Sequence, residues 1–241
     1  MYTIHPYNQN VNTTLGVGSK IVLINGSPRK NGATSIILQY ISSQLKSYSF
    51  ETEIVHVSDI KLQYCMGCCK CYKIGKCIFS DDIEKLSHKI GKADGIIIGS
   101  PTYASNISGQ LKTIIDRGHF VIEQLLYQKY AMSVVTYENY GGKAASKILN
   151  SLLEYSGAFV TGSLVVKNPF SHNPLKDREI QRCVSKKTMN FYGSLMKQKI
   201  PKLQSLKHFF IFQCGIIPFV RKKGEDYSGV LKAWKKNKRR F

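Results

Sequence analysis

Short apolar runs alternate with amphipathic segments over most of the chain. Five runs that are rich in β-branched residues or alternate in polarity predict strands, at residues 21–24, 51–57, 94–100, 130–136 and 158–166. Between them, apolar positions at helical spacing predict helices, at residues 33–47, 81–92, 108–126 and 142–155. Strands that alternate with helices pair in parallel and are covered on both faces, so the pattern predicts an α/β fold with a doubly wound sheet.

Composition divides the 241 residues into three parts. Residues 1–19 carry no Lys, Arg, Asp or Glu and predict a polar N-terminal arm. The alternating pattern fills residues 20–170 and is interrupted by a cysteine-rich loop at residues 65–77. Residues 171–241 predict a C-terminal helical extension that ends in a basic tail.

The loop after the first predicted strand has the residues of a phosphate site. Gly26 and Gly32 allow close approach of the backbone, and Ser27, Thr34 and Ser35 offer hydroxyl groups. The next helix adds free N–H groups and the positive end of its dipole. The spacing matches neither a Walker A loop nor the Rossmann fingerprint. The loop therefore predicts a bound nucleotide of another class, with an ordinary βα turn as the alternative.

Two further loops, at residues 100–106 and 136–142, also follow predicted strands. Ligands of doubly wound sheets bind outside the carboxyl ends of the strands, where the strand order switches. We therefore expect the loops at residues 26–34, 100–106 and 136–142 to meet around one ligand.

These loops carry a family resemblance. Residues 25–34 (NGSPRKNGAT), 93–103 (ADGIIIGSPTY) and 111–117 (LKTIIDR) resemble the NAD(P)H-dependent FMN reductase group of flavodoxin-like proteins. The resemblance covers about residues 20–166. It implies an FMN-binding, flavodoxin-like three-layer sandwich with a five-stranded parallel sheet in the order 2-1-3-4-5.

The resemblance also implies which residues contact the flavin. The FMN phosphate would be held by Ser27, Arg29, Asn31, Thr34 and Ser35. The flavin ring would be lined by Pro101, Thr102, Tyr103, Ala104 and Asn106, and its other side would be closed by Thr136, Tyr137, Glu138 and Gly141. One departure is Ala33, where members of the family often have Asn, so a side-chain contact to the phosphate or ribityl chain is in doubt.

Five cysteines occur within residues 65–77. The spacing of Cys65, Cys68, Cys71 and Cys77 suits the four thiolates of a [4Fe-4S] cluster and leaves Cys69 over. The run is similar to the compact cluster motif of iron–sulfur flavoproteins, which carry it after the second strand of the same fold. Nearby lysines would offset the negative charge of the cluster, namely Lys70, Lys73 and Lys76.

Other roles for these cysteines stay open. A four-thiolate zinc site usually has two separated C-x2-C pairs, which this run lacks. Disulfides are disfavoured in a chain without an export signal, and we expect a cytoplasmic protein. Free or redox-active thiols are the strongest alternative. Cys183 and Cys214 stand alone in the sequence and are expected to be buried apolar residues.

The formal net charge of +20 raises the question of nucleic acid or membrane binding. No DNA- or RNA-binding motif accompanies the charge, so we expect no specific nucleic acid partner. The apolar stretch at residues 209–220 is interrupted by glycine and proline and is too short to span a bilayer. Packing on the main domain or on a second subunit is favoured over peripheral membrane contact by this stretch and the tail.

The sequence thus predicts an oxidoreductase whose chemistry resides in the flavin, with no catalytic side chain required. It would pass electrons from NAD(P)H to a quinone, a flavin or another small acceptor. The alternative is an electron carrier with FMN and a [4Fe-4S] cluster that is linked to ferredoxin and has no organic substrate of its own. The resemblance implies a homodimer or homotetramer.

Overall fold

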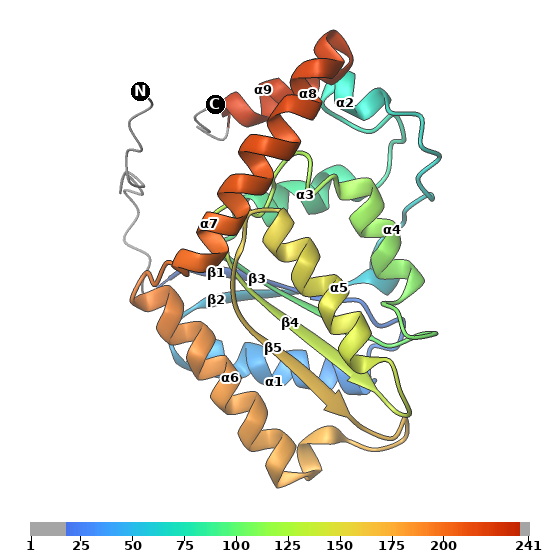
Figure 1. The fold of residues 1–241 in the computed structure, drawn as a ribbon. Helices are drawn as coiled ribbons and strands as arrows, with labels where there is room; N and C mark the ends of the chain where they lie inside the picture. Colours follow the sequence, from blue (N-terminus) through green and yellow to red (C-terminus); the bar gives the residue numbers. More distant parts are fainter. Residues whose placement is uncertain (1–17, 237–241) are drawn as a thin grey trace.

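The computed structural model describes residues 18–236, and its centre is a five-stranded sheet (Figure 1). All strands are parallel, in the order β2-β1-β3-β4-β5. The predicted fold class and strand order are confirmed. The strands are β1 (Lys20–Asn25), β2 (Glu51–His56), β3 (Gly95–Pro101), β4 (Tyr130–Tyr137) and β5 (Phe159–Lys167).

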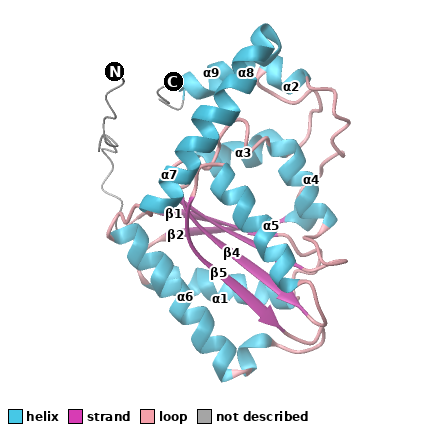
Figure 2. Cartoon of the chain, in the orientation of Figure 1, coloured by secondary structure: helices cyan, strands magenta, loops and turns pink. Residues whose placement is uncertain are grey.

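Helices cover both faces of the sheet (Figure 2). One face is covered by α3 (Ile83–Lys92), α4 (Gly109–Gly118) and α5 (Gly142–Tyr155). The other is covered by α1 (Ala33–Ser47) and α6 (Arg178–Met196). Because strand side chains point to alternate faces, Val22 and Ile24 pack in the first layer while Ile21 and Leu23 pack in the second. This explains why β1 reads as a continuous apolar run.

The helix predicted at residues 108–126 is shorter in the structure, where α4 ends at Gly118. His119 has a φ of 51°, in the left-handed region, and the chain continues in turns to residue 128. Phe120 and Leu126 are nevertheless buried. The helix-like spacing of apolar residues here reflects burial in turns rather than a longer helix.

The predicted C-terminal helical extension is confirmed. Within the described residues it continues after α6 in α7 (Lys202–Phe210), a π-helical turn (Ile211–Ile216), α8 (Ile217–Lys223), a 3-10 turn (Gly224–Tyr227) and α9 (Ser228–Lys236). Its apolar side chains form a second small core of their own, made by Phe212, Ile216, Ile217, Val220, Tyr227, Val230 and Trp234.

Glycine and proline do not interrupt this extension as the sequence suggested. Gly215 lies in the π-helical turn and Pro218 is the second residue of α8, and the helical backbone continues through both. The helical segment Lys202–Lys235 is long and apolar enough to cross a membrane, judged by length and composition alone. Its most apolar stretch of 18 residues has a mean hydropathy of 1.2. Only 28% of that stretch is buried in the protein, so much of its apolar surface faces outward.

The extension packs on the cysteine-rich loop, through α9 and the short helix α2 (Lys70–Ile74), which lie together at one end of the molecule (Figure 1). The rings of Tyr72 and Tyr227 stack with centroids 4.6 Å apart. Ser228 Oγ donates a hydrogen bond to the Lys73 carbonyl oxygen at 3.0 Å. The position of the loop therefore depends on residues more than 150 positions later in the chain.

Gly229 tests this packing. A Cβ atom there would lie 2.3 Å from the backbone nitrogen of Gly75, so the substitution Gly229→Ala must push α9 away from α2. We expect it to lower the free energy of unfolding by about 1–3 kcal/mol, measured by urea denaturation. In the control Gly215→Ala the new Cβ meets nothing within 4 Å, and stability should be unchanged or higher. Equal stabilities of the two variants would show that the close contact is not maintained in solution.

Candidate functional site

The loop after β1 is fixed against the end of β3 and the N-cap of α4. Gly26 N–H donates to the Gly99 carbonyl oxygen at 2.7 Å, and Ser108 Oγ donates to the Gly26 carbonyl oxygen at 2.5 Å. A Cβ atom at Gly26 would lie 2.6 Å from the same Gly99 oxygen, so only glycine fits. The first loop therefore begins at a defined place on the carboxyl edge of the sheet.

The hydroxyl side chains of this loop lie inside the protein. Ser27, Thr34 and Ser35 are each at most 1% exposed. Thr34 Oγ1 lies 2.7 Å from Thr136 Oγ1, so the first and third loops meet although they are 102 residues apart. No side chain caps the N-terminus of α1 after Gly32. The first N–H groups of α1 are therefore not occupied by a capping side chain and can bind an anion.

The loop after β3 is a tight turn with an unusual backbone. Tyr103 and Asn106 exchange two backbone hydrogen bonds of 2.9 Å. Between them, Ala104 and Ser105 have φ values of 46° and 62°, in a backbone region that residues other than glycine rarely adopt. Such backbone strain is often found where a loop contacts a ligand.

This second loop also contacts the third. Thr102 N–H donates to the Thr136 carbonyl oxygen at 2.8 Å. A Cβ atom at Gly141 would lie 2.5 Å from Ser105 Cα, so these two loops touch. Thr102 Oγ1 is buried and has no hydrogen-bond partner. An orphaned buried hydroxyl at the point where the three loops meet fits a site that holds a polar group of a ligand.

The outer residues of the predicted flavin site are less enclosed. Arg29 and Asn31 are exposed, and Lys30 between them forms an ion pair with Asp59 at 2.6 Å. Tyr103 is 45% exposed. The remaining predicted contacts vary in exposure: Pro101 is buried, Tyr137 and Glu138 are half-buried, and Ala104 and Asn106 are exposed.

A fourth segment, after β5, also lies at the carboxyl edge of the sheet. Its contribution to the site was not predicted from the sequence. The Arg29 guanidinium lies over the Phe170 ring, 5.3 Å from its centroid. Phe170 N–H donates to Glu138 Oε1 at 3.4 Å. The same rule that selected the other loops, position after a parallel strand, would have identified this segment.

The cysteines of the loop at residues 65–77 face one small cavity of about 20 Å³ that is open to solvent. Cys71 is buried, Cys77 is half-buried, and Cys65 and Cys68 are exposed. Cys69 is exposed as well and its Sγ donates to the Gly67 carbonyl oxygen of the same loop at 3.4 Å. The cavity is lined by Cys65, Met66, Cys68, Cys69, Cys71, Cys77, Ile78, Phe79, Arg117 and His119.

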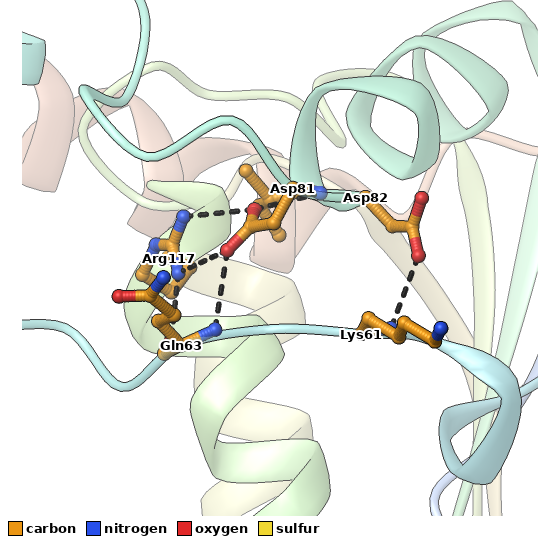
Figure 3. Close-up of polar contacts among 6 residues, drawn as sticks. Lys61, Gln63, Asp81, Asp82 and Arg117 are labelled. Carbon is orange, nitrogen blue, oxygen red and sulfur yellow. Dashed lines mark hydrogen bonds and ion pairs between the residues drawn. The ribbon is translucent and has the colours of Figure 1, made fainter.

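Both ends of the cysteine-rich loop are tied to α4 by one arginine (Figure 3). Arg117 donates to both carboxylate oxygens of Asp81, at 2.9 and 3.0 Å, and to the Gln63 carbonyl oxygen at 2.5 Å. Its side chain is 1% exposed and that of Asp81 is 9% exposed. The sequence motif around Arg117 gave no sign of this role. The adjacent acidic residue, Asp116, is not the partner of Arg117 and pairs with Lys112 instead.

The ionisation of Asp81 supports the same contact. Burial raises the pKa of Asp81, but hydrogen bonds from Arg117 and from the N–H groups of Gln63 and Ile83 outweigh burial, so the pKa lies below its ordinary value of 3.8. The carboxylate is therefore charged at neutral pH and holds the Arg117 guanidinium in place.

His119 brings a second cation to the cavity. Burial lowers the pKa of His119, but hydrogen bonds to Cys71 and to Glu123 outweigh this effect and raise the pKa to about 10. The ring is therefore positively charged at neutral pH. Its position beside Cys71 could not be predicted, because the sequence pattern placed His119 within a regular helix. The lysines predicted to offset the cluster charge, Lys70, Lys73 and Lys76, are exposed on the surface. Lys73 Nζ lies 4.0 Å from Asp226 Oδ1.

The donor set fits a large thiolate-bound group better than a single ion. Within residues 18–236, no three His, Cys, Asp or Glu side chains are grouped as one metal ion requires. A four-iron cluster spreads its ligands around a larger volume, and four thiolates around a cavity with two cations suit its negative charge.

The two remaining cysteines, Cys183 and Cys214, are exposed, so the expectation that they are buried was wrong.

The model of the NADPH-dependent FMN reductase family matches residues 19–172. The chain belongs to this family. The match includes all five strands and each of the loops at the carboxyl edge. The family establishes the chain as a flavin-dependent oxidoreductase with FMN as its cofactor, and the resemblance of the sequence motifs is confirmed.

Relatives of this FMN reductase family member include iron–sulfur flavoproteins. One from Clostridioides difficile is 39% identical, over 89% of this chain and 96% of the relative. Another, from Archaeoglobus fulgidus, is 36% identical over 61% of this chain and 67% of the relative. A solved NADH:FMN oxidoreductase has the same fold, with a TM-score of 0.57 and 19% identity over 76% of this chain and 92% of that one.

The Arg117–Asp81 pair leads to a test of what holds the cysteine-rich loop. Asp81→Asn leaves the buried Arg117 guanidinium without its counter-ion, and we expect the free energy of unfolding at pH 7 to fall by about 3 kcal/mol in urea denaturation. Because the pKa of Asp81 is lowered on folding, the contribution of the pair is present above about pH 3.8 and is lost as the pH falls below that value. The variant should therefore lose less stability in acid than the parent.

The matched control is Asp82→Asn, one residue away (Figure 3). Asp82 accepts a hydrogen bond from the Lys61 N–H at 3.0 Å but lies on the surface. The free energy of unfolding of the Asp82→Asn variant should stay close to that of the parent. If both variants lose the same stability, the buried ion pair is not what fixes the loop.

Proposed function

We propose that this protein is an iron–sulfur flavoprotein that transfers electrons between a [4Fe-4S] cluster and FMN. The observation that carries the proposal is that Cys65, Cys68, Cys71 and Cys77 line one cavity together with two buried cations. A loop of spare thiols would need neither a shared cavity nor a buried arginine at its base. The iron–sulfur flavoprotein from Clostridioides difficile, which matches nearly the whole chain, supports the same choice.

In this proposal the first loop holds the FMN phosphate. The hydroxyl groups of Ser27, Thr34 and Ser35 and the free N–H groups at the start of α1 would bind its oxygens, and Arg29 would add positive charge. Asn31 lies in the same loop. The strained turn at Ala104 would bring backbone groups and the orphaned Thr102 hydroxyl to the ring.

The cysteine-rich loop would hold the cluster. Thiolates of the four cysteines are its ligands, and Arg117 and His119 stabilise the added negative charge from inside the protein. When bound, the cluster exchanges single electrons and FMN exchanges one or two. The protein itself orients the two groups and excludes part of the solvent. No acid–base side chain is needed.

We further propose a reduced iron–sulfur protein such as ferredoxin as the electron donor, a small acceptor such as a quinone or flavin, a cytoplasmic location and a homo-oligomer. The second candidate is direct reduction by NAD(P)H, which the name of the family supports. Anaerobic mixing with NADH, NADPH or reduced ferredoxin separates the two. Bleaching of the flavin by a nicotinamide alone, at a rate that ferredoxin does not exceed, would favour the second candidate.

Thr34→Val tests the phosphate site. Valine keeps the shape of the side chain but removes the hydroxyl group, so the loss of a hydrogen bond to a charged oxygen should weaken FMN binding by about 1.5–3 kcal/mol. The measurement is fluorescence titration of FMN into the flavin-free protein. Thr188→Val is the control, since this buried hydroxyl group donates to the Val184 carbonyl oxygen in α6, away from the loops. Equal affinities of both variants would place the phosphate elsewhere.

Cys68→Ser and Cys69→Ser test the cluster. The two cysteines are adjacent, but only Cys68 belongs to the proposed ligand set. We expect Cys68→Ser to lose iron, acid-labile sulfide and brown absorbance while it retains FMN, and Cys69→Ser to retain all three properties. Iron and sulfide assays on anaerobically purified protein give the result. Full iron in Cys68→Ser would refute the ligand set, and a parent protein without iron would refute the cluster.

A further inference from the structure

One face of α7 is apolar and directed away from the protein. Leu203 is 81% exposed, Leu206 53%, Phe209 46% and Phe210 55%. Leu203, Leu206 and Phe210 follow one another at helical spacing, so they form a continuous stripe. Such a row of large exposed apolar side chains is unusual for a surface that contacts only water.

The opposite face of the same helix is fixed to the FMN-binding domain. Gln204 exchanges two hydrogen bonds of 2.9 Å with the backbone of Val160 in β5. Ser205 and His208 are buried, as is Phe212 in the core of the extension. The helix is therefore held in place from within. A span across a bilayer would break these contacts, whereas contact through the outer face would leave them intact.

The charged residues of the segment that carries the apolar stripe all have the same sign. Residues 197–223 contain seven Lys and Arg residues and no Asp or Glu. Lys197, Lys199 and Lys202 are exposed before the stripe, and Arg221, Lys222 and Lys223 are exposed after it. Lys207 beside the stripe pairs with Glu154 at 2.6 Å. An apolar stripe between cations is the pattern of a helix that lies in the interface of an anionic membrane.

We propose that the outer face of α7, with Leu203, Leu206, Phe209 and Phe210, docks on an anionic lipid bilayer. The apolar side chains enter the boundary between headgroups and acyl chains, and the flanking lysines and arginines contact the lipid phosphates. A second copy of the chain is the poorer partner for this face, because it would bring together two segments with the same positive charge on chains of net charge +20. The proposal is independent of the iron–sulfur cluster.

Vesicle sedimentation with the full chain tests the proposal. We expect binding to vesicles of phosphatidylcholine mixed with phosphatidylglycerol, weaker binding as salt is raised, and little binding to phosphatidylcholine alone. The double variant Leu206→Ser, Phe210→Ser keeps the charge and removes two apolar contacts. Its affinity for the mixed vesicles should fall by at least about tenfold.

Met189→Ser is the matched control, because Met189 is a similarly exposed apolar residue, 48% exposed, on α6. It should bind the mixed vesicles like the parent, and the circular dichroism spectra of all variants should agree. Three results would overturn the proposal: no binding of the parent to mixed vesicles, equal binding of the double variant, or a parent dimer that the double variant converts to a monomer. The second result would leave only nonspecific attraction of charge, and the third would assign the face to a second copy.

Discussion

The buried ion pair between Arg117 and Asp81 connects the two chemical parts of this molecule. Arg117 is the penultimate residue of α4, a helix whose N-cap residue Ser108 donates a hydrogen bond to Gly26 in the loop after β1. Asp81, the partner of Arg117, follows the cysteine-rich loop. A single guanidinium therefore holds the cysteine-rich loop at a fixed position relative to the carboxyl edge of the sheet. Burying two charges is costly, so the pair persists only because each polar atom of the carboxylate is hydrogen-bonded, to Arg117, Gln63 and Ile83.

The C-terminal extension holds the same loop from the other side. The parallel sheet and its helices form two apolar layers without it, whereas α2 and Tyr72 pack against the separate core of the extension. The cysteines thus lie between the flavin domain and the extension. The match to the relative from Clostridioides difficile covers 89% of the chain and so must include more than half of residues 171–241. The sequence similarity to that relative therefore extends into the C-terminal extension.

The sequence was informative wherever a local pattern determined the structure. Continuous apolar runs located β1 and β3, and position after a parallel strand brought Thr34 and Thr136 together across 102 residues. It failed where the deciding contact was distant and carried no periodic signal. Nothing near Arg117 identifies Asp81 as its partner, and the left-handed His119 ends α4 although the apolar spacing continues. Cys214 looked like a core residue because its neighbours are apolar, but the helix turns it outward.

An arginine is needed at position 117 for geometric reasons. Its planar guanidinium donates to both Asp81 oxygens and at the same time to the Gln63 carbonyl oxygen, so three acceptors from two separate segments are satisfied by one side chain. A lysine ammonium would place the same charge but could not meet a carboxylate bidentately. Phe79 lies against the guanidinium, with its ring centroid 5.0 Å away, and shields it from water. Because the loop that carries the cysteines has little regular structure beyond α2, its position is fixed by this side chain on one side and by the packing of α2 on α9 on the other.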